Sequence, residues 1–222
     1  RDCLLSRGLG DVYKRQFKVF YDYKKEGIWQ LGEEAAAAAN GQEPGDIKVQ
    51  DVDGNGVITT DDRIIYSQRP DVTFGFNNTF NYKGFDLSVF LYARLGQWIA
   101  YDYNTTYRIN ALENGGNVDY WTPENPTNAF PRPNKSKSYT QVTYYSTLKY
   151  EDGSFFKIRD ITLGYTFKPE LLKHLNLSRL RVYATAKNFF TFSKIDNYDP
   201  EQGGSISFPM TKQLVFGLNV EF

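Results

Sequence analysis

Hydrophobic and polar side chains alternate with a period of two along five long stretches of this chain. In the last stretch, TKQLVFGLNVEF, the apolar residues occupy every second position from Leu214 to Phe222, and only Val215 breaks the polar set. This alternation predicts β-strands with one apolar face and one polar face. The five predicted strands span residues 72–82, 85–95, 154–167, 179–192 and 211–222.

The stretch SFFKIRDITLGYTF changes phase in its middle. Phe156 and Ile158 share one phase, whereas Ile161 and Leu163 share the other. A slip of one residue within a strand predicts a β-bulge at 159–160. A sixth and shorter candidate strand, FKVFYDY, begins at Phe17.

The lengths of the strands and of their connections predict a fold class. The strands have about 10–14 residues, whereas about 5–6 is most common in globular proteins and about 9–11 tilted residues cross a bilayer. Short links, the hairpin at 83–84 and the segment 168–178 with a helical turn after Pro169, alternate with long polar loops. These loops span residues 25–71, 97–153 and 193–209. This alternation of short links and long loops is typical of an outer-membrane β-barrel with long extracellular loops.

A soluble β-sandwich is the alternative fold, because its strands also alternate. Its strands would be shorter and its turns more evenly spaced than those of this chain. The composition agrees with strands: 17% of the residues are aromatic, and the mean hydropathy of -0.54 together with the lack of a long apolar run excludes a membrane helix. Positive and negative side chains number 26 each, so no basic surface for nucleic acid is expected.

The first sixteen residues, RDCLLSRGLGDVYKRQ, do not resemble the sequence that follows them. They resemble adapter-derived read-through at the end of a translated fragment, and we expect residues 1–16 to be a non-native leader before a truncated chain. Cys3 is the single cysteine, so no internal disulfide can form. Residues 17–222 are the portion on which the fold prediction rests.

The stretch DVDGNGVITTDD has the pattern of a calcium loop. Calcium takes about 6–8 oxygen ligands, and Gly56 stands where such a loop turns sharply. An Asx-rich turn without metal is the alternative. The twelfth position holds an aspartate in place of the usual glutamate, which leaves bidentate binding open. The predicted ligands of a structural Ca²⁺ are Asp51, Asp53, Asn55, the carbonyl of Val57, Thr59 and Asp62.

Six segments resemble a known family when they are taken in order. They are GDIKVQDVDGNGVITTDDR, YKGFDLSVF, YWTPENPTNAFPRP, FFKIRDITLGYTF, LRVYATAKNFFTFSKIDNYDPE and the final FGLNVEF. Together they resemble the C-terminal barrel portion of the SusC/RagA family of TonB-dependent outer-membrane transporters of Bacteroidota. The resemblance covers residues 17–222.

This resemblance implies an all-β fold, in which about six strands form the C-terminal part of a large antiparallel transmembrane barrel of about 22 strands. It also implies import of oligosaccharides, or of peptides in some members, across the outer membrane. The implied partners are a SusD-like surface lipoprotein that acts as a lid, the TonB complex, which acts through an N-terminal part outside this chain, and outer-membrane lipid. The terminal aromatic residue, Phe222, resembles the signal that the barrel-assembly machinery reads.

No set of residues for catalysis is visible, and the sole histidine, His174, is expected to be a solvated residue of the link at 168–178. We therefore expect no enzyme activity. Aromatic residues of the long loops are candidates for stacking on a sugar ring, and ordinary loop packing is the alternative. A calcium-stabilised β module that binds ligands at the cell surface remains the alternative function. The candidate substrate contacts are Trp98, Tyr101, Tyr103 and Trp121.

Overall fold

The computed structural model describes residues 18–110, 115–173 and 176–222. The chain divides into two compact units. The loop unit comprises the chain up to Arg69 and Tyr101–Glu151, and the sheet unit comprises Pro70–Ala100 and Asp152–Phe222. The expected leader, residues 1–16, and His174 lie outside the described residues, so the predictions about them stay predictions.

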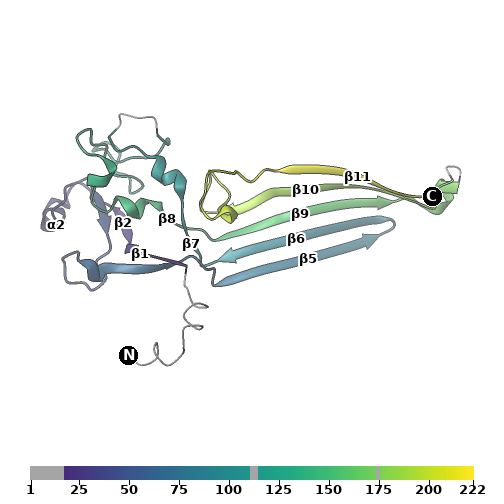
Figure 1. Cartoon of the computed structure of the whole chain (residues 1–222), viewed down its shortest axis with the longest axis horizontal. Coiled ribbons are helices and arrows are strands. Elements are labelled where there is room, and N and C mark those ends of the chain that lie inside the picture. The colour runs from purple at the N-terminus through teal and green to yellow at the C-terminus, as the bar shows by residue number, and fades with distance from the viewer. Residues whose placement is uncertain (1–17, 111–114, 174–175) are drawn as a thin grey trace, which may run out of the picture. The chain divides into compact units, whose positions relative to one another are not determined.

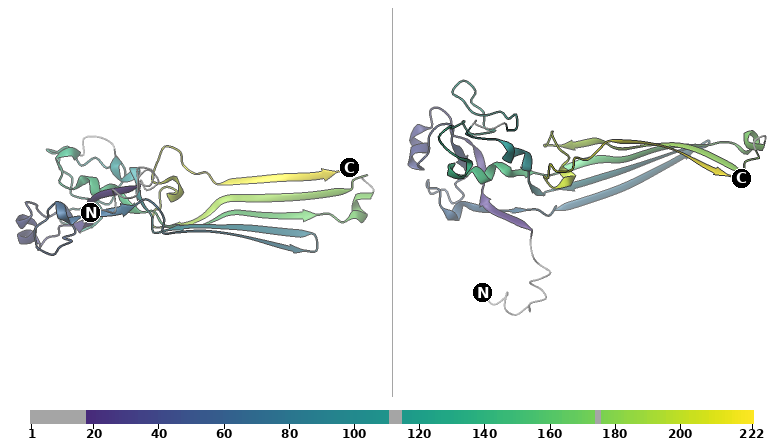
Figure 2. Two further views of the ribbon diagram at one scale, coloured as in Figure 1. Left: turned by 60° about the horizontal axis from the view of Figure 1, so that its bottom comes forward. Right: turned by 45° about the horizontal axis from the view of Figure 1, so that its top comes forward.

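The sheet unit is built on one antiparallel sheet of five strands, in the order β11-β10-β9-β6-β5 (Figure 1). The two further views show these strands as a single twisted layer (Figure 2). They are the five strands that the alternation predicts, with nearly the same ends. Their bounds are β5 Val72–Tyr82, β6 Phe85–Leu95, β9 Phe155–Thr166, β10 Arg179–Ser193 and β11 Gln213–Glu221.

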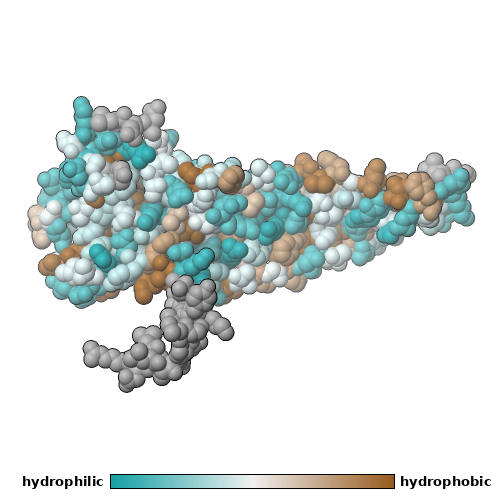
Figure 3. Space-filling model, viewed as in Figure 1, coloured by the Kyte–Doolittle hydropathy of each residue, from teal (hydrophilic) through white to brown (hydrophobic). Residues whose placement is uncertain are grey.

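The register aligns apolar side chains with apolar ones, and polar side chains with polar ones, across the sheet. Leu163 of β9 lies opposite both Leu87 of β6 and Ala184 of β10, whereas its neighbour Thr162 lies opposite Ser88 and Thr185. The sheet therefore has an apolar face and a polar face, names that we keep below. Large side chains of the apolar face remain uncovered, and Phe216 is 77% exposed. In the space-filling view, hydrophobic residues gather along the edge of the sheet that β11 forms (Figure 3).

The hairpin between β5 and β6 is a two-residue turn, as predicted. Lys83 and Gly84 both have positive φ, 48° and 90°. Two successive positive φ values characterise the type I′ turn, whose twist matches that of antiparallel strands. The helical turn predicted after Pro169 is also present, as α3, Pro169–Leu172.

The predicted bulge in β9 is confirmed, because the register with β6 shifts between Phe90 and Leu91, opposite 158–160. A second irregularity, between Lys187 and Phe190 of β10, is not predicted by the pattern. Asn188 has a φ of 58° there. Two residues of β10 lie between the paired positions Lys187 and Phe190. The apolar residues on either side therefore stay at even-numbered positions, and the alternation of apolar and polar residues gives no sign of the irregularity.

The loop unit holds short strands and turns around a small core. The predicted strand at 17–23 forms as β1, but it pairs with β4 in a separate two-stranded sheet and does not join the long sheet. β2 pairs with β3 in a further two-stranded sheet. The core consists of Ile28, Ile47, Val49, Trp121 and Leu148. The bounds are β1 Val19–Tyr23, β2 Lys25–Ile28, α2 Glu34–Ala39, β3 Ile47–Val49, η1 Thr60–Asp62, β4 Arg63–Ser67, η2 Asp102–Thr106, η3 Tyr139–Gln141 and η4 Tyr145–Lys149.

Three short elements complete the chain. β7, Trp98–Ala100, and β8, Tyr150–Asp152, stand where the chain passes from one unit to the other, and η6 is Pro200–Gln202. Among the described residues, no helix is both long enough and apolar enough to cross a membrane.

Candidate functional site

Three carboxylates of the calcium-like loop lie together. One oxygen from each of Asp51, Asp53 and Asp62 can be chosen so that all three lie within 4.8 Å of one another. Asp62 is fully buried, whereas Asp53 is exposed. The fold thus brings together three of the predicted ligands, and a hard divalent cation is the kind of ion that such oxygens bind.

Backbone N–H groups hold the loop in its curled form. The Asp51 carboxylate accepts hydrogen bonds from the backbone N–H of Gly54, at 2.8 Å, and of Gly56, at 2.7 Å. Gly56 has a φ of 83°, which lies in the left-handed region that glycine adopts at no steric cost. The glycine that the pattern marks as a turn residue therefore occupies a sharp turn.

Asp62 closes the loop from its other end. Its carboxylate accepts hydrogen bonds from the backbone N–H of Thr59, at 2.7 Å, and of Val52, at 2.8 Å. These N–H groups lower the pKa of the Asp62 carboxyl below its usual value, since they stabilise the charged form. Asp62 is therefore ionised at neutral pH although it is buried.

The remaining predicted ligands make local hydrogen bonds. The Asn55 side chain donates to Asp53 at 2.7 Å, and its carbonyl oxygen accepts from the Val57 N–H at 2.8 Å. The Thr59 hydroxyl accepts from the N–H of Asp61 at 3.2 Å and caps η1. These contacts are those of an Asx-rich turn, so the loop geometry fits both interpretations of the sequence.

The four aromatic candidates for sugar stacking differ in exposure. Trp121 is 4% exposed, packs in the core of the loop unit and donates to the Gln30 side chain at 2.8 Å. Tyr101 is 5% exposed. Neither ring offers a free face to a ligand in this structure. Trp98 and Tyr103 are partly exposed, and ligand contact is proposed below for these two alone.

An ion pair crosses the polar face of the sheet. Arg181 of β10 donates to both carboxylate oxygens of Asp86 of β6, with Nε 2.9 Å from Oδ1. The pair passes over Gly164 of β9, where a Cβ atom would lie 2.5 Å from either side chain. Sequence analysis missed this pair, because its partners are 95 residues apart. The only sign of the pair in the sequence is that both residues stand at polar positions of their strands.

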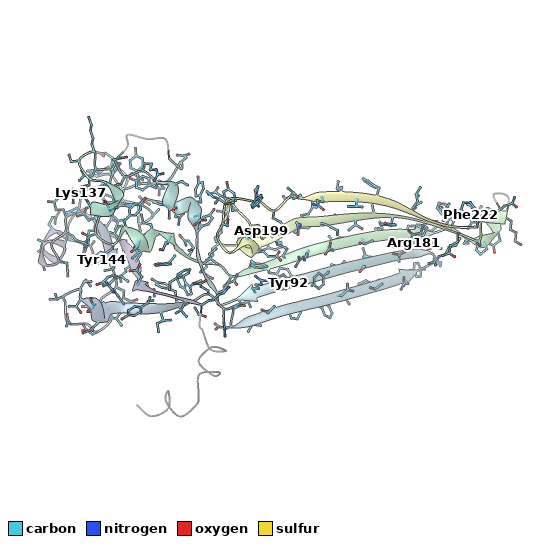
Figure 4. The ribbon with its side chains drawn as sticks, viewed as in Figure 1. Tyr92, Lys137, Tyr144, Arg181, Asp199 and Phe222 are labelled. Carbon is cyan, nitrogen blue, oxygen red and sulfur yellow. The ribbon has the colours of Figure 1, made fainter. Side chains whose placement is uncertain are left out.

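A second charged cluster lies toward the other end of the same face. Figure 4 shows Tyr92 and Asp199 at that end, and Arg181 and Phe222 at the opposite one. Lys157 of β9 is fully buried and contacts Asp199 at 2.6 Å and Glu201 at 2.8 Å. The segment that follows β10 therefore folds back onto the polar face. Sequence analysis missed this cluster as well.

A cavity of about 300 Å³ lies between the end of β10 and this segment. Its lining is mostly polar. The lining residues are Asn188, Phe189, Thr191, Ser193, Ile195, Asp196, Asn197, Tyr198, Asp199, Pro209, Met210 and Lys212.

The whole chain is similar to known receptors. The TonB-dependent receptor P3 of Formosa agariphila is 31% identical over 100% of the chain. The TonB-dependent receptor SusC of Bacteroides thetaiotaomicron is 31% identical over 78% of it. The predicted SusC/RagA resemblance is confirmed. No family model matches the chain. The chain spans 24% of the length of receptor P3 and 17% of that of SusC.

Solved structures of the same type share the fold. The RagAB peptide transporter superposes with a TM-score of 0.67 at 24% identity, over 91% of this chain and 23% of that one. The RagAB peptide importer in its closed-closed state gives a TM-score of 0.64 at 25% identity, with the same shares. The predicted fold class, part of a large antiparallel SusC/RagA-type barrel, is confirmed. The relatives named here are receptors and transporters, which agrees with the expectation of a chain without enzyme activity.

Proposed function

We propose that the chain is part of a TonB-dependent outer-membrane transporter that imports oligosaccharides or peptides together with a SusD-like surface lipoprotein. The observation that carries this proposal is the 31% identity to a TonB-dependent receptor over the whole chain. The TonB complex would act through a part of the protein outside this chain. The site of action would be the outer membrane of a Gram-negative bacterium of the Bacteroidota type.

The two faces of the sheet support this function. The apolar face carries exposed side chains such as Phe216 and Leu218, which suit contact with outer-membrane lipid. The polar face carries charged and hydroxyl side chains, including Arg181, Asp86 and Thr185, which suit a hydrated interior. Neither face resembles a basic surface for nucleic acid.

Partly exposed aromatic residues of the long loops would contribute to substrate contact. Of the four candidates, Trp98 and Tyr103 are partly exposed. Their rings could stack on a sugar or pack against an apolar peptide side chain. Substitution of each by alanine in the whole receptor should weaken uptake without lowering the amount of receptor in the membrane.

We also propose that the loop Asp51–Asp62 binds Ca²⁺ as a structural ion. The convergence of three carboxylates supports this, and a weak extracellular site of about 10⁻⁴–10⁻³ M would suffice. The calcium-stabilised binding module that the sequence left open as an alternative function receives no support from the relatives, since these are TonB-dependent receptors.

Uptake by cells tests the proposal. Cells that express the whole receptor with its neighbouring lipoprotein should accumulate labelled oligosaccharide or peptide, and loss of TonB should abolish the accumulation. Cells that express the receptor with an intact TonB complex, yet accumulate neither kind of molecule, would contradict it. A receptor variant unable to contact TonB provides the matched control for passive leakage.

A further inference from the structure

A lysine without any exposed side-chain surface organises one end of the polar face. Lys157 lies in β9, opposite Tyr92 of β6 and Thr191 of β10, and its side chain is 0% exposed. A buried ammonium group is costly unless it is paired and hydrogen-bonded. Its partners, Asp199 and Glu201, both come from the segment after β10. This segment must therefore be folded inward for the buried charge to be balanced.

The cluster is balanced in charge and locally rigid. Arg159 contacts Glu201 at 3.0 Å, so two cations face two carboxylates. The Asp199 carboxylate also accepts from the Glu201 N–H at 3.0 Å, which caps the turn η6. Pro200 at the start of that turn is fully buried. Residues 199–201 are thus fixed by several independent contacts, and Asp199 holds a fixed position in the lining of the cavity described above.

The same segment borders the cavity of about 300 Å³. This volume lies at the lower limit of small-molecule sites, which is about 300–1,000 Å³. Asp199 links the two features, because it lines the cavity and also pairs with Lys157. A change in the ion cluster would therefore change the shape of the cavity.

The lining indicates the chemistry of a ligand. The lining residues Asn188, Asn197, Thr191 and Ser193 carry amides and hydroxyls, groups that both donate and accept hydrogen bonds. Asn188 and Ser193 also donate to the carbonyls of Thr211 and Ile195, and their side-chain oxygens are still able to accept. Phe189 and Tyr198 are also lining residues, and an aromatic ring can pack against a flat C–H face of a ligand.

The charges of the lining cancel. The charge of Asp199 is balanced by Lys157, and the other two charged residues, Asp196 and Lys212, have opposite signs. One common mode of peptide recognition adds an extended strand to a sheet edge through main-chain hydrogen bonds, whereas this site is a compact cavity bordered by the end of β10 and the segment after it. The lining therefore favours an uncharged ring that carries hydroxyl groups.

We propose that this cavity is a subsite for one uncharged sugar ring of the transported molecule, and that Lys157 is its positioning residue. The proposal rests on the transport function proposed above and adds to it the place and the chemical class of a ligand contact. Lys157 does not line the cavity; it acts by holding Asp199, which does, and the neighbouring Glu201 of the turn η6.

Binding to the purified whole receptor tests the subsite. The probe is the best-bound member of an array of neutral oligosaccharides, and an uncharged hexapeptide of alanine, serine and glycine is the competing ligand. The pair Thr191→Val and Asn197→Ala should weaken binding of the glycan about tenfold, the loss expected for one or two hydrogen bonds. Unchanged affinity of this double variant would overturn the subsite.

Substitutions of Lys157 test its positioning role. Lys157→Met should weaken binding of the same glycan by a similar factor, and Lys157→Arg, which keeps the positive charge, should restore most of it. Arg179→Met is the matched control, because it removes an exposed ion pair with Glu221 near the other end of β10. A Lys157→Met variant that is folded and binds the glycan like wild type would overturn the role of Lys157.

The outcomes separate this inference from the transport function. TonB-dependent uptake of the glycan, with unchanged affinity in the cavity variants, would overturn the subsite and leave transport standing. Glycan binding that the cavity variants weaken, without any uptake, would support the subsite and contradict transport. Preference of the wild type for the hexapeptide, or absence of binding to every neutral glycan, would overturn the proposed ligand class.

Discussion

At the scale of single residues, buried charges in this protein are stabilised by local donors or by distant partners. Asp62 is fully buried and accepts N–H bonds from Val52 and Thr59, which lie within its own loop. Lys157 is equally buried, but its partners lie 42 and 44 residues away. The first arrangement is complete within one short loop, whereas the second exists only once the long sheet has formed.

The calcium proposal is tested at this scale. The whole receptor should bind Ca²⁺ with a dissociation constant of about 10⁻⁴–10⁻³ M, and the Asp51→Ala/Asp53→Ala variant should lose this binding, because two of three converging carboxylates are gone. Isothermal titration calorimetry measures both. Asp61→Ala is the control, since Asp61 is an exposed acidic neighbour outside the cluster. A wild-type loop that stays ordered in chelator and binds no Ca²⁺ would show an Asx-rich turn only.

Acid should loosen the same loop through Asp62. Its pKa is lowered in the folded protein from the usual value of 3.8, so it stabilises the fold above about pH 4 and loses this effect as the pH falls through the lowered pKa. The protection of the Val52 and Thr59 amides, measured as hydrogen exchange relative to the intrinsic rate at each pH, should therefore fall in acid. Asp62→Asn should lower this protection already at neutral pH and make it depend less on acid. Equal dependence of the protection on pH in the two proteins would contradict this role.

At the scale of elements, alternation fixes the faces of each strand, and close approach between strands adds a second constraint. Gly164 of β9 lies beneath the pair of Arg181 and Asp86, where a Cβ atom would approach both side chains to 2.5 Å. Gly75 of β5 has room for a methyl group, because an added Cβ would lie 3.7 Å from the nearest atom, in Phe90. Both glycines stand in regularly paired stretches of their strands, but only the first is required by its neighbours.

Substitution of these glycines should have different effects. Gly164→Ala should displace the ion pair and lower the thermal stability of the inserted receptor, at a cost of about 1–3 kcal/mol for overpacking. Gly75→Ala should change stability by less than about 1 kcal/mol, because its new methyl group makes an ordinary contact. Heat-modifiable migration on gels measures the unfolding of both. Equal stability of the two variants would show that the ion pair can move aside freely.

At the scale of the whole molecule, the order of the strands leads to a topology in the membrane. Antiparallel strands place alternate connections on opposite sides, so the links at Lys83–Gly84 and at α3 share one side, and the long loops at 97–153 and 193–209 share the other. The long loop at 25–71 leads into β5 at that second side. If β11 ends at the periplasmic side, the long loops are extracellular. The loop Asp51–Asp62 and the proposed sugar subsite then both face the outside of the cell.

Labelling of single cysteines on intact cells checks this topology. A cysteine at exposed Glu124 should react with a membrane-impermeant reagent, whereas one at exposed Glu170 of α3 should react only after the outer membrane is opened. Both substitutions replace an exposed glutamate, so their effects on folding should be similar. The reverse pattern of reactivity would place the long loops in the periplasm.

The end of the chain should matter for assembly. Phe222 follows β11 and is 94% exposed, so it makes little contact that would stabilise the fold. Deletion of Phe222 from the whole receptor should lower the amount inserted into the outer membrane, and the inserted fraction should keep its thermal stability. Phe216→Ala, which changes an exposed aromatic residue of the same strand, is the control. An unchanged yield would mean that Phe222 is one more apolar side chain.

The sequence by itself determined the five long strands, their two faces, the tight turn at Lys83–Gly84 and the bulge in β9. These features follow from local rules, because successive side chains of a strand point to opposite faces. A break in that period of two can be recognised directly in the amino-acid sequence. The same local rules marked the loop Asp51–Asp62, whose hydrogen bonds stay within one short segment.

Only the tertiary structure decided which strands pair and which polar groups meet. β1 reads as one more strand of the long sheet, yet it pairs with β4. For Trp121 the sequence left both sugar stacking and loop packing open, and the structure buries it against Gln30, 91 residues earlier in the chain. Lys157 stands at a polar position of its strand, and only the structure shows that Asp199 and Glu201 enclose it. Each depends on partners that are distant in sequence, and no local pattern of hydrophobic and polar residues specifies such a partner.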